Sequence, residues 1–134
     1  MKLGDSHQFE YTITEADTAA KVAFDPSDVY PEVLATARMV ALMEIAASRL
    51  IAPLVGEGQL SVGVDVNVRH LAANGVGKTI SAKATYTSFD GKLHAFEVEI
   101  FDPSGTCGRG THTRAIIDND RLIQGALRRE SSPR

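Results

Sequence analysis

The sequence predicts an α+β domain in which one long helix covers one face of an antiparallel sheet. A single helix-forming stretch, 31–54, stands among segments of β-type pattern. Downstream of it, apolar residues recur with a period of two, and turn signals separate consecutive strands. At 134 residues the chain fits one domain, which we place at 1–134.

The stretch from Pro31 to Leu54 is dominated by Ala, Leu, Met, Glu and Arg, which are strong helix formers. Pro31 suits the first turn of a helix, and Pro53 and Gly56 end it. Thr36 is a plausible N-cap inside the stretch. The segment therefore predicts either one helix from Pro31 or a short turn followed by the main helix.

Five further segments have strand patterns. In one of them valines occupy the even positions 62 to 68 and polar residues most odd ones, which predicts a half-buried strand with the valines on the covered face. Asp90-Gly91 between two alternating runs is a strong hairpin signal. We expect a loop at 15–28 and a polar tail with at most one helical turn at 119–134. The predicted strands are 7–14, 61–70, 78–88, 93–101 and 106–118.

Charge and cysteine content limit the partners of the chain. Fourteen Lys and Arg against 17 Asp and Glu give a net charge of −3, which disfavours a nucleic-acid binder. Cys107 is the only cysteine, and with four scattered histidines it matches no zinc spacing, so we expect no metal and no redox cofactor. No stretch approaches the roughly 20 apolar residues of a membrane span. We expect a cytoplasmic protein without membrane partners.

A sheet with one covered face buries a modest core, and its terminal strands leave unpaired edges. Unpaired strand edges favour association with another copy. The sequence therefore predicts a homodimer.

Glu44 is the first candidate for chemistry. Its helical neighbours at three and four residues are apolar or small, with no Lys or Arg among Val40, Ala41, Ala47 and Ser48. A carboxylate on the covered side of a helix costs free energy unless it is hydrogen-bonded, and burial raises its pKa. The alternative is that Glu44 faces water.

His70 and Thr36 are the other two candidates. His70 is in register with Val68, so it points towards the helix and could approach Glu44 as a general base, unless the strand ends at Arg69 and His70 is an exposed turn residue. Thr36 begins the main helix, where backbone N–H groups can stabilise an oxyanion, although a Thr there is commonly only a cap. Eight helical residues separate Thr36 from Glu44 by about 12 Å, so the two cannot touch directly.

The last predicted strand offers a weaker signal. Gly108, Gly110, His112 and Arg114 share one parity, so a ligand could approach the backbone at the glycines. Arg114 could then bind a phosphate or carboxylate, or it forms a surface ion pair.

Several blocks together resemble one family. The residues 30–47 (YPEVLATARMVALMEIAA), Ser61-Val62-Gly63 leading to His70, and 110–115 (GTHTRA) are similar to the fluoroacetyl-CoA thioesterase group of hotdog-fold acyl-CoA thioesterases. The resemblance runs from about Tyr30 to Ile117. It implies an antiparallel sheet wrapped around one long helix, usually in a dimer.

Carried over residue by residue, the resemblance implies a catalytic triad of Thr36, Glu44 and His70 and substrate contacts at Gly63, Arg114 and Tyr30. Tyr30 keeps one of the two lid aromatics of the family member that selects fluorinated substrate. The other falls near Ser27, in a dissimilar stretch, so the resemblance does not extend to fluoroacetyl specificity.

The resulting expectation is hydrolysis of a short acyl-CoA thioester to a carboxylate and CoA, with CoA entering only as part of the substrate. Two alternatives remain open. The protein could be a non-catalytic acyl-CoA or lipid-binding module. It could also hydrate or dehydrate an acyl-CoA, although the Asp and His pairing usual in hotdog dehydratases is absent.

Overall fold

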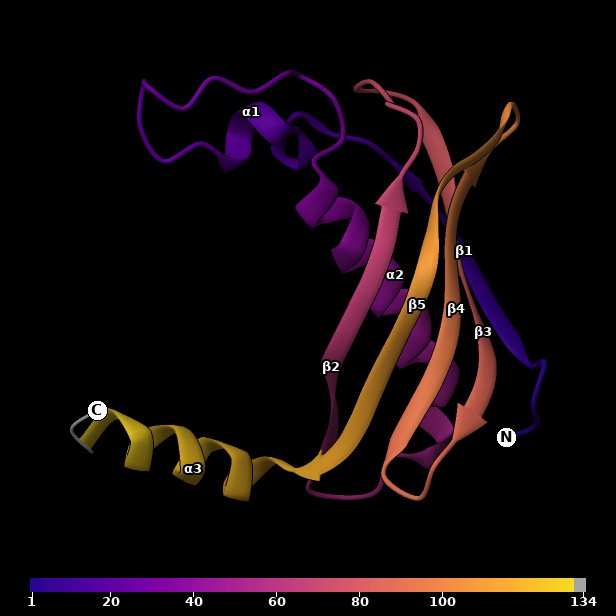
Figure 1. The fold of residues 1–134 in the computed structure, drawn as a ribbon, viewed down its shortest axis with the longest axis vertical. Helices are drawn as coiled ribbons and strands as arrows, with labels where there is room; N and C mark the ends of the chain where they lie inside the picture. Colours follow the sequence, from indigo (N-terminus) through magenta and orange to yellow (C-terminus); the bar gives the residue numbers. More distant parts are fainter. Residues whose placement is uncertain (132–134) are drawn as a thin grey trace.

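The computed structural model describes residues 1–131, and its main element is a five-stranded antiparallel sheet (Figure 1). The strand order is β1-β3-β4-β5-β2, so β1 and β2 form the two edges. The strands are β1 (Ser6–Thr12), β2 (Gln59–His70), β3 (Thr79–Phe89), β4 (Leu93–Asp102) and β5 (Gly105–Asp118). The predicted α+β class is confirmed, and all five strands lie close to the predicted ranges.

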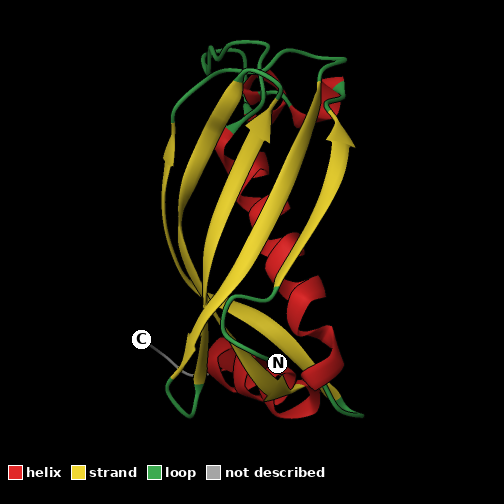
Figure 2. Ribbon diagram, turned by 90° about the vertical axis from the view of Figure 1, so that its right-hand side faces the viewer, coloured by secondary structure: helices red, strands yellow, loops and turns green. Residues whose placement is uncertain are grey.

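Helix α2 (Thr36–Ile51) crosses one face of the curved sheet (Figure 2). Its apolar residues recur at helical spacing, so one side of the helix is buried: Met39, Leu42, Met43, Ala46, Ala47, Leu50 and Ile51. Alternate residues of β3 and β4 complete the core from the sheet: Ile80, Ala82, Ala84, Phe96, Val98 and Ile100. A short 3-10 turn, η2 (Ala52–Leu54), follows the helix.

The long helix begins at Thr36, as in the second of the two predicted arrangements. Ala35, with φ −67° and ψ 142°, is the N-cap, so the prediction of Thr36 as the cap is wrong by one residue. Ala35 is kept extended because its N–H donates to the backbone oxygen of Asp17, and Val33 forms a β-bridge with Gly75. The Thr36 hydroxyl is therefore not used to cap the helix.

Strand β2 contains a β-bulge that the valine pattern did not reveal. Gly63 lies opposite Arg114, and Asp65 opposite Thr113, so Val64 has no partner. One extra residue moves the following side chains to the other face. Val68 therefore shares the helix-facing side with His70, whereas Val62 lies on the opposite side, and the prediction of a single valine face is wrong.

The predicted loop 15–28 contains two short helices, η1 (Glu15–Asp17) and α1 (Ala19–Val22). The predicted polar tail contains helix α3 (Asn119–Ser131), much longer than the one turn expected. Its start is stabilised because the N–H of Arg121 donates to the Asp118 carboxylate. The rest of the predicted tail, 132–134, lies outside the described residues.

Two segments project from the body on the same side as the free edge of β2 (Figure 1). One holds α1 and the loop that leads to α2, and the other is α3. Within residues 1–131, no helix combines the length and the apolar character needed to cross a membrane.

Candidate active site

The first residue of α2 and the last residue of β2 meet at one end of the sheet. Thr36 Oγ1 and His70 Nδ1 share a hydrogen bond of 2.8 Å. His70 is half-buried within the strand, so the alternative of an exposed turn residue is wrong. Its other ring nitrogen, Nε2, is buried and has no hydrogen-bond partner among residues 1–131.

A pocket of about 450 Å³ opens beside this pair. Its walls come from the segment before α2 and from the loop after β2, and they include Pro31, Val33, Thr36, His70, Ala72 and Ala73. The lining is mainly apolar and small, apart from the hydroxyl and the imidazole. This arrangement suits a small apolar group with one reactive polar centre.

The start of α2 adds electrostatic character to the pocket. The first intrahelical hydrogen bond runs from Met39 N to Ala35 O, so the amides of Thr36, Ala37 and Arg38 precede it. Such amides and the positive end of the helix dipole stabilise negative charge that develops on a carbonyl oxygen. A hydroxyl paired with an imidazole, next to these amides, is a geometry for acyl transfer.

Asp17 fixes the position of the helix start. Its carboxylate, only 1% exposed, accepts hydrogen bonds from Tyr11 Oη (2.7 Å), from the N–H and hydroxyl of Thr14 (2.8 and 2.9 Å), and from Arg38 Nε (3.0 Å). Burial alone raises the pKa of Asp17, but the hydrogen bonds outweigh burial and hold it below its ordinary value. Our sequence analysis missed this residue, although the spacing Thr14-x-x-Asp17 is a capping-box signal.

Hydrogen bonds fix the loop that follows His70. The amides of Leu71 and Ala72 both donate to the backbone oxygen of Cys107, at 2.7 and 3.0 Å. Buried Asn74 donates through Nδ2 to Asp102 Oδ2 at 3.0 Å and accepts the N–H of Leu34 at its backbone oxygen. These contacts tie the pocket wall to the turn between β4 and β5.

Glu44 lies in a second polar cluster, where side chains of helix α2 and strand β5 meet. Its Oε1 accepts a hydrogen bond from Arg114 Nη1 at 3.1 Å; the Arg114 side chain is 9% exposed and that of Glu44 36%. Arg114 also donates through Nε to Ser61 Oγ and through Nη2 to Ser61 O. Arg114 therefore forms an ion pair, as one alternative predicted, but its guanidinium is buried and not at the surface. Glu44 is bonded to Arg114 and does not simply face water.

His112 completes this second cluster. Its Nδ1 donates to the backbone oxygen of Asp65 at 2.8 Å, and its Nε2 accepts from Arg114 Nη1 at 3.2 Å, an assignment that follows from the partners. Burial, with the charge of Arg114, lowers the pKa of His112, so the ring stays neutral. A Cβ at Gly63 would overlap Glu44 Oε1, so a larger residue there would require the Glu44 carboxylate to move.

The chain therefore carries two polar clusters along α2: Thr36 with His70, and Glu44 with Gly63 and Arg114. Within residues 1–131, no hydrogen bond joins Glu44 to either member of the first cluster. Tyr30 lies half-exposed in the segment before α2. No three His, Cys, Asp or Glu side chains in the described part of the chain are grouped to hold a metal ion.

Comparisons of the sequence with known proteins show the family. Residues 13–120 match the family model of fluoroacetyl-CoA-specific thioesterases. A fluoroacetyl-CoA thioesterase of Streptantibioticus cattleyicolor is 31% identical over 124 residues, which cover 91% of this chain and 89% of the relative.

Solved structures add the fold. The structure of the fluoroacetyl-CoA thioesterase FlK superposes with a TM-score of 0.89 at 31% identity, covering 99% of this chain and 98% of FlK. FlK variants have been solved with fluoroacetate and CoA, and with acetyl-CoA. A hot-dog-like protein from Thermanaerovibrio acidaminovorans, 21% identical, superposes with a TM-score of 0.83 over 100% of this chain and 96% of its own. The chain therefore belongs to the fluoroacetyl-CoA-specific thioesterase family, with its hotdog fold, and is a thioester hydrolase.

Proposed function

We propose that this protein hydrolyses short-chain acyl-CoA thioesters to a carboxylate and CoA, with Thr36 and His70 as the reacting pair and Glu44 as the acid that assists the imidazole. The observation that carries the proposal is the 2.8 Å contact between Thr36 Oγ1 and His70 Nδ1, beside a small pocket at the start of α2. The complexes of FlK with CoA and with acetyl-CoA support this substrate class.

In the proposed reaction the thioester carbonyl lies against the first-turn amides of α2. Thr36 attacks the carbonyl carbon, or holds the water that attacks it, and His70 Nδ1 takes the proton. The amides stabilise the oxyanion. When the C–S bond breaks, His70 returns the proton to the sulfur, so that CoA leaves as a free thiol. When Thr36 is the nucleophile, the acyl group stays on Oγ1 as an ester; a water that gives its proton to His70 then hydrolyses this ester, which releases the carboxylate and restores Thr36. The proposed mechanism uses water, side chains and backbone amides of the protein, and CoA is part of the substrate.

We further propose that the working unit is a homodimer formed through the free edges of two β2 strands. This edge exposes Leu60, Val64 and Val66, and backbone groups along it lack a strand partner. Two-fold symmetric pairing of identical edges is antiparallel, and it closes the sheet edge with a self-complementary contact.

Antiparallel pairing of β2 also gives a role to Glu44. The His70 end of one strand then lies beside the Gln59 end of the other, where Gly63 contacts Glu44. The Nε2 of His70, buried and unpaired in one chain, would donate its N–H to Glu44 of the partner subunit once the imidazole turns towards the dimer seam. A carboxylate there orients the imidazole and stabilises it when protonated.

The substrate contacts follow from the same arrangement. We assign Tyr30 to the acyl side of the pocket, because Pro31 next to it lines the wall. Gly63 leaves room for the Glu44 carboxylate beside the proposed dimer seam, and Arg114 holds that carboxylate in place.

The test is a panel of acyl-CoA thioesters, including acetyl-CoA and fluoroacetyl-CoA, monitored for released thiol and run beside His70→Ala. Turnover should fall by about a thousandfold in the variant. His7→Ala on β1 is the matched control and should keep wild-type turnover. Saturable acyl-CoA binding without thiol release would instead support a binding module, and unchanged turnover in His70→Ala would remove the assigned site.

A further inference from the structure

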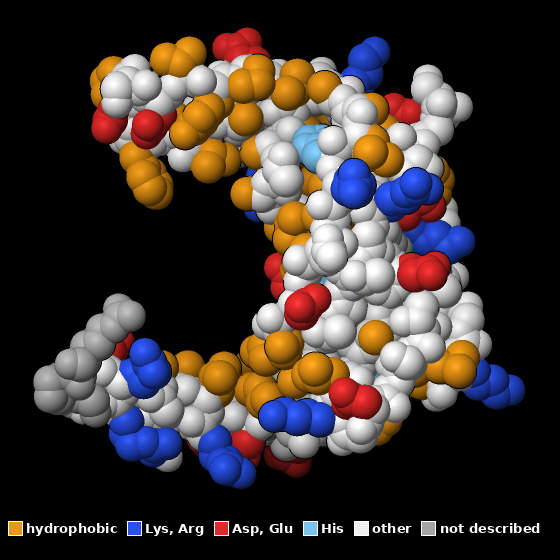
Figure 3. Space-filling model, in the orientation of Figure 1, with side chains coloured by type: hydrophobic (Ala, Val, Ile, Leu, Met, Phe, Trp, Pro, Cys, Tyr) orange, Lys and Arg blue, Asp and Glu red, His pale blue; other side chains and the backbone are white. Residues whose placement is uncertain are grey.

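The segment before α2, residues 23–32, forms an exposed apolar surface that we call the N-terminal arm. Phe24 is 98% exposed, and Val29 and Tyr30 are also exposed. Large apolar side chains gather on this arm in the space-filling view (Figure 3). Exposed apolar clusters of this kind mark interaction sites.

Helix α3, the C-terminal arm, is the second such surface. Leu122, Ile123 and Leu127 lie on one side of it at helical spacing, and all three are exposed. None of its residues from 119 to 131 is buried. A 13-residue helix with an uncovered apolar side is marginal in water, because most helical stability comes from packing of that side.

The two arms carry opposite charge. Asp25, Asp28 and Glu32 lie on the N-terminal arm. The C-terminal arm carries Arg121, Arg128 and Arg129 together with Asp120 and Glu130, so it is positive on balance. Figure 3 shows acidic side chains on the first arm and basic ones on the second, with the hollow that borders β2 between the two arms. Complementary charges around apolar centres favour one partner and one orientation.

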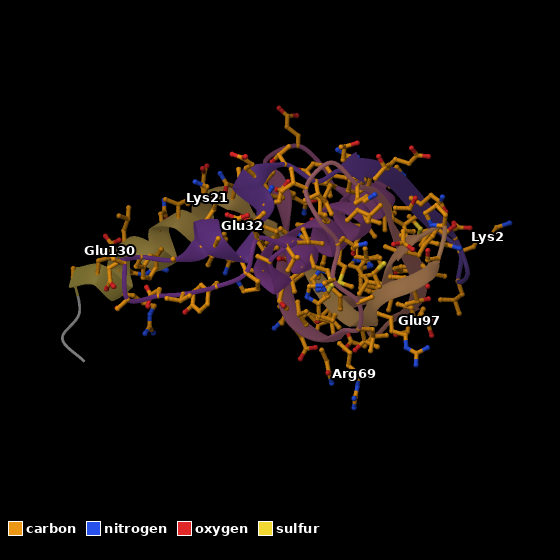
Figure 4. All side chains as sticks on the ribbon, turned by 90° about the horizontal axis from the view of Figure 1, so that it is seen from above. Lys2, Lys21, Glu32, Arg69, Glu97 and Glu130 are labelled. Atoms are coloured by element: carbon orange, nitrogen blue, oxygen red, sulfur yellow. The ribbon has the colours of Figure 1, made fainter. Side chains whose placement is uncertain are left out.

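The arms are also attached to opposite ends of β2. At the Gln59 end, Gln59 pairs with Asp118, and the N–H of Asn119 donates to Gly58 O, so α3 starts there. At the His70 end, the following loop bridges Val33 through Gly75, which holds the N-terminal arm. Viewed from above, Glu32 and Glu130 lie on the same side of the molecule, and Lys2 lies on the opposite side (Figure 4).

The positions of the two arms determine which of them come together in the proposed dimer. Antiparallel pairing of two β2 strands brings the Gln59 end of one copy, with its C-terminal arm, to the His70 end of the other, with its N-terminal arm. The apolar sides and the opposite charges of the two arms then face each other.

We infer that the C-terminal arm of a second copy packs against the N-terminal arm and forms the outer wall of the Thr36–His70 pocket. The inference rests on the homodimer proposed above. Pro31 belongs to both the N-terminal arm and the pocket lining, and Val33, directly after the arm, also lines the pocket. Each pocket is therefore incomplete in one chain, and Leu127 of the partner subunit closes it over the acyl group.

Cross-linking tests the contact directly. One chain carries Phe24→Cys and a second chain carries Leu127→Cys; both positions are exposed, so both variants should fold. The native Cys107 is buried. The two chains are mixed, allowed to exchange, and treated with a short bismaleimide. We expect a covalent dimer that contains one chain of each kind.

The matched control replaces Phe24→Cys by Leu3→Cys, which is exposed before β1, at the opposite edge of the sheet. This mixture should give no mixed dimer. A dimer by light scattering without the Phe24–Leu127 cross-link would overturn the inference and leave the proposed homodimer standing. A monomer by light scattering would overturn both.

Activity gives a second, independent readout. The double variant Ile123→Asp/Leu127→Asp should raise KM for short acyl-CoA substrates about tenfold, because the acyl group loses its apolar wall. Since Thr36 and His70 are unchanged, saturated turnover should fall much less than in His70→Ala. An unchanged KM would contradict the inference that α3 of the second copy lines the pocket. A loss of turnover equal to that of His70→Ala would also overturn it, because α3 would then act in the catalytic step and not in acyl binding.

Discussion

The two polar clusters along α2 differ in how completely their hydrogen bonds are satisfied. Around Arg114, three nitrogens donate to Ser61, Glu44 and His112, and His112 uses both of its own nitrogens. At the other cluster, His70 has one partner, Thr36, and a buried nitrogen without any. The Arg114 cluster is hydrogen-bonded throughout its buried part, whereas the Thr36–His70 cluster is open beside a pocket.

This contrast indicates that Arg114 and its partners stabilise the fold, whereas Thr36 and His70 are available for reaction. A saturated buried network specifies the packing of β2 and β5 on α2, because every group would be unsatisfied if one member were removed. An imidazole with an unused nitrogen and a hydroxyl partner is free to move a proton. We therefore expect substitutions at Thr36 and at Arg114 to affect different measurements.

The largest expected effect is on activity at Thr36. Thr36→Val removes the hydroxyl and should lower kcat/KM by about a thousandfold, while Thr36→Ser retains most activity. The free energy of unfolding should change by less than about 0.5 kcal/mol, because the hydroxyl does not cap the helix. Thiol release and urea denaturation measure the two quantities. A large loss of stability would mean that the open cluster is structural after all.

The next effect is on stability at Arg114. Arg114→Met leaves the partly buried Glu44 carboxylate and Ser61 without their donors and should cost about 3 kcal/mol in urea denaturation. Arg109→Met, on the same strand but exposed, should cost less than about 0.5 kcal/mol. Equal stabilities for the two variants would erase the distinction between the clusters.

The smallest effect is on pH dependence. The folded pKa of His112 lies below its ordinary value of 6.5, so the neutral ring contributes stability above that pH, and this contribution is lost as pH falls through the folded pKa. The unfolding free energy should decrease as pH drops below 6.5. His112→Gln should flatten part of this slope, and the rest belongs to His94, whose pKa is also lowered by burial. A slope unchanged in His112→Gln would show that the ring is not held neutral.

Local patterns predicted most of the fold, because periodicity and turn residues are local. The Asp-Gly hairpin and the alternating strands were found this way. The exact start of α2 was not, since Ala35 is held extended by a bond to Asp17 that is 18 residues away in sequence. Helix α3 was read as a polar tail because its three large apolar residues cover nothing within the described chain.

The candidate site was predicted only in part. Parity placed His70 towards the helix, and its contact with Thr36 agrees with that orientation. The partner of Glu44 was not predictable from helical neighbours, because Arg114 comes from a strand 70 residues later. The role of Asp17 was missed because its four donors gather from three separate segments.

The bulge at Val64 has a consequence for comparing relatives of this protein. Before the bulge the odd-numbered residues of β2 face the helix, and after it the even-numbered residues do. Deletion of the one extra residue here would restore regular alternation and leave the inward and outward side chains on their faces. A one-residue deletion elsewhere in β2 would instead exchange inward and outward side chains between that point and the bulge. Alignments that place the single gap elsewhere in β2 would therefore pair residues with opposite environments.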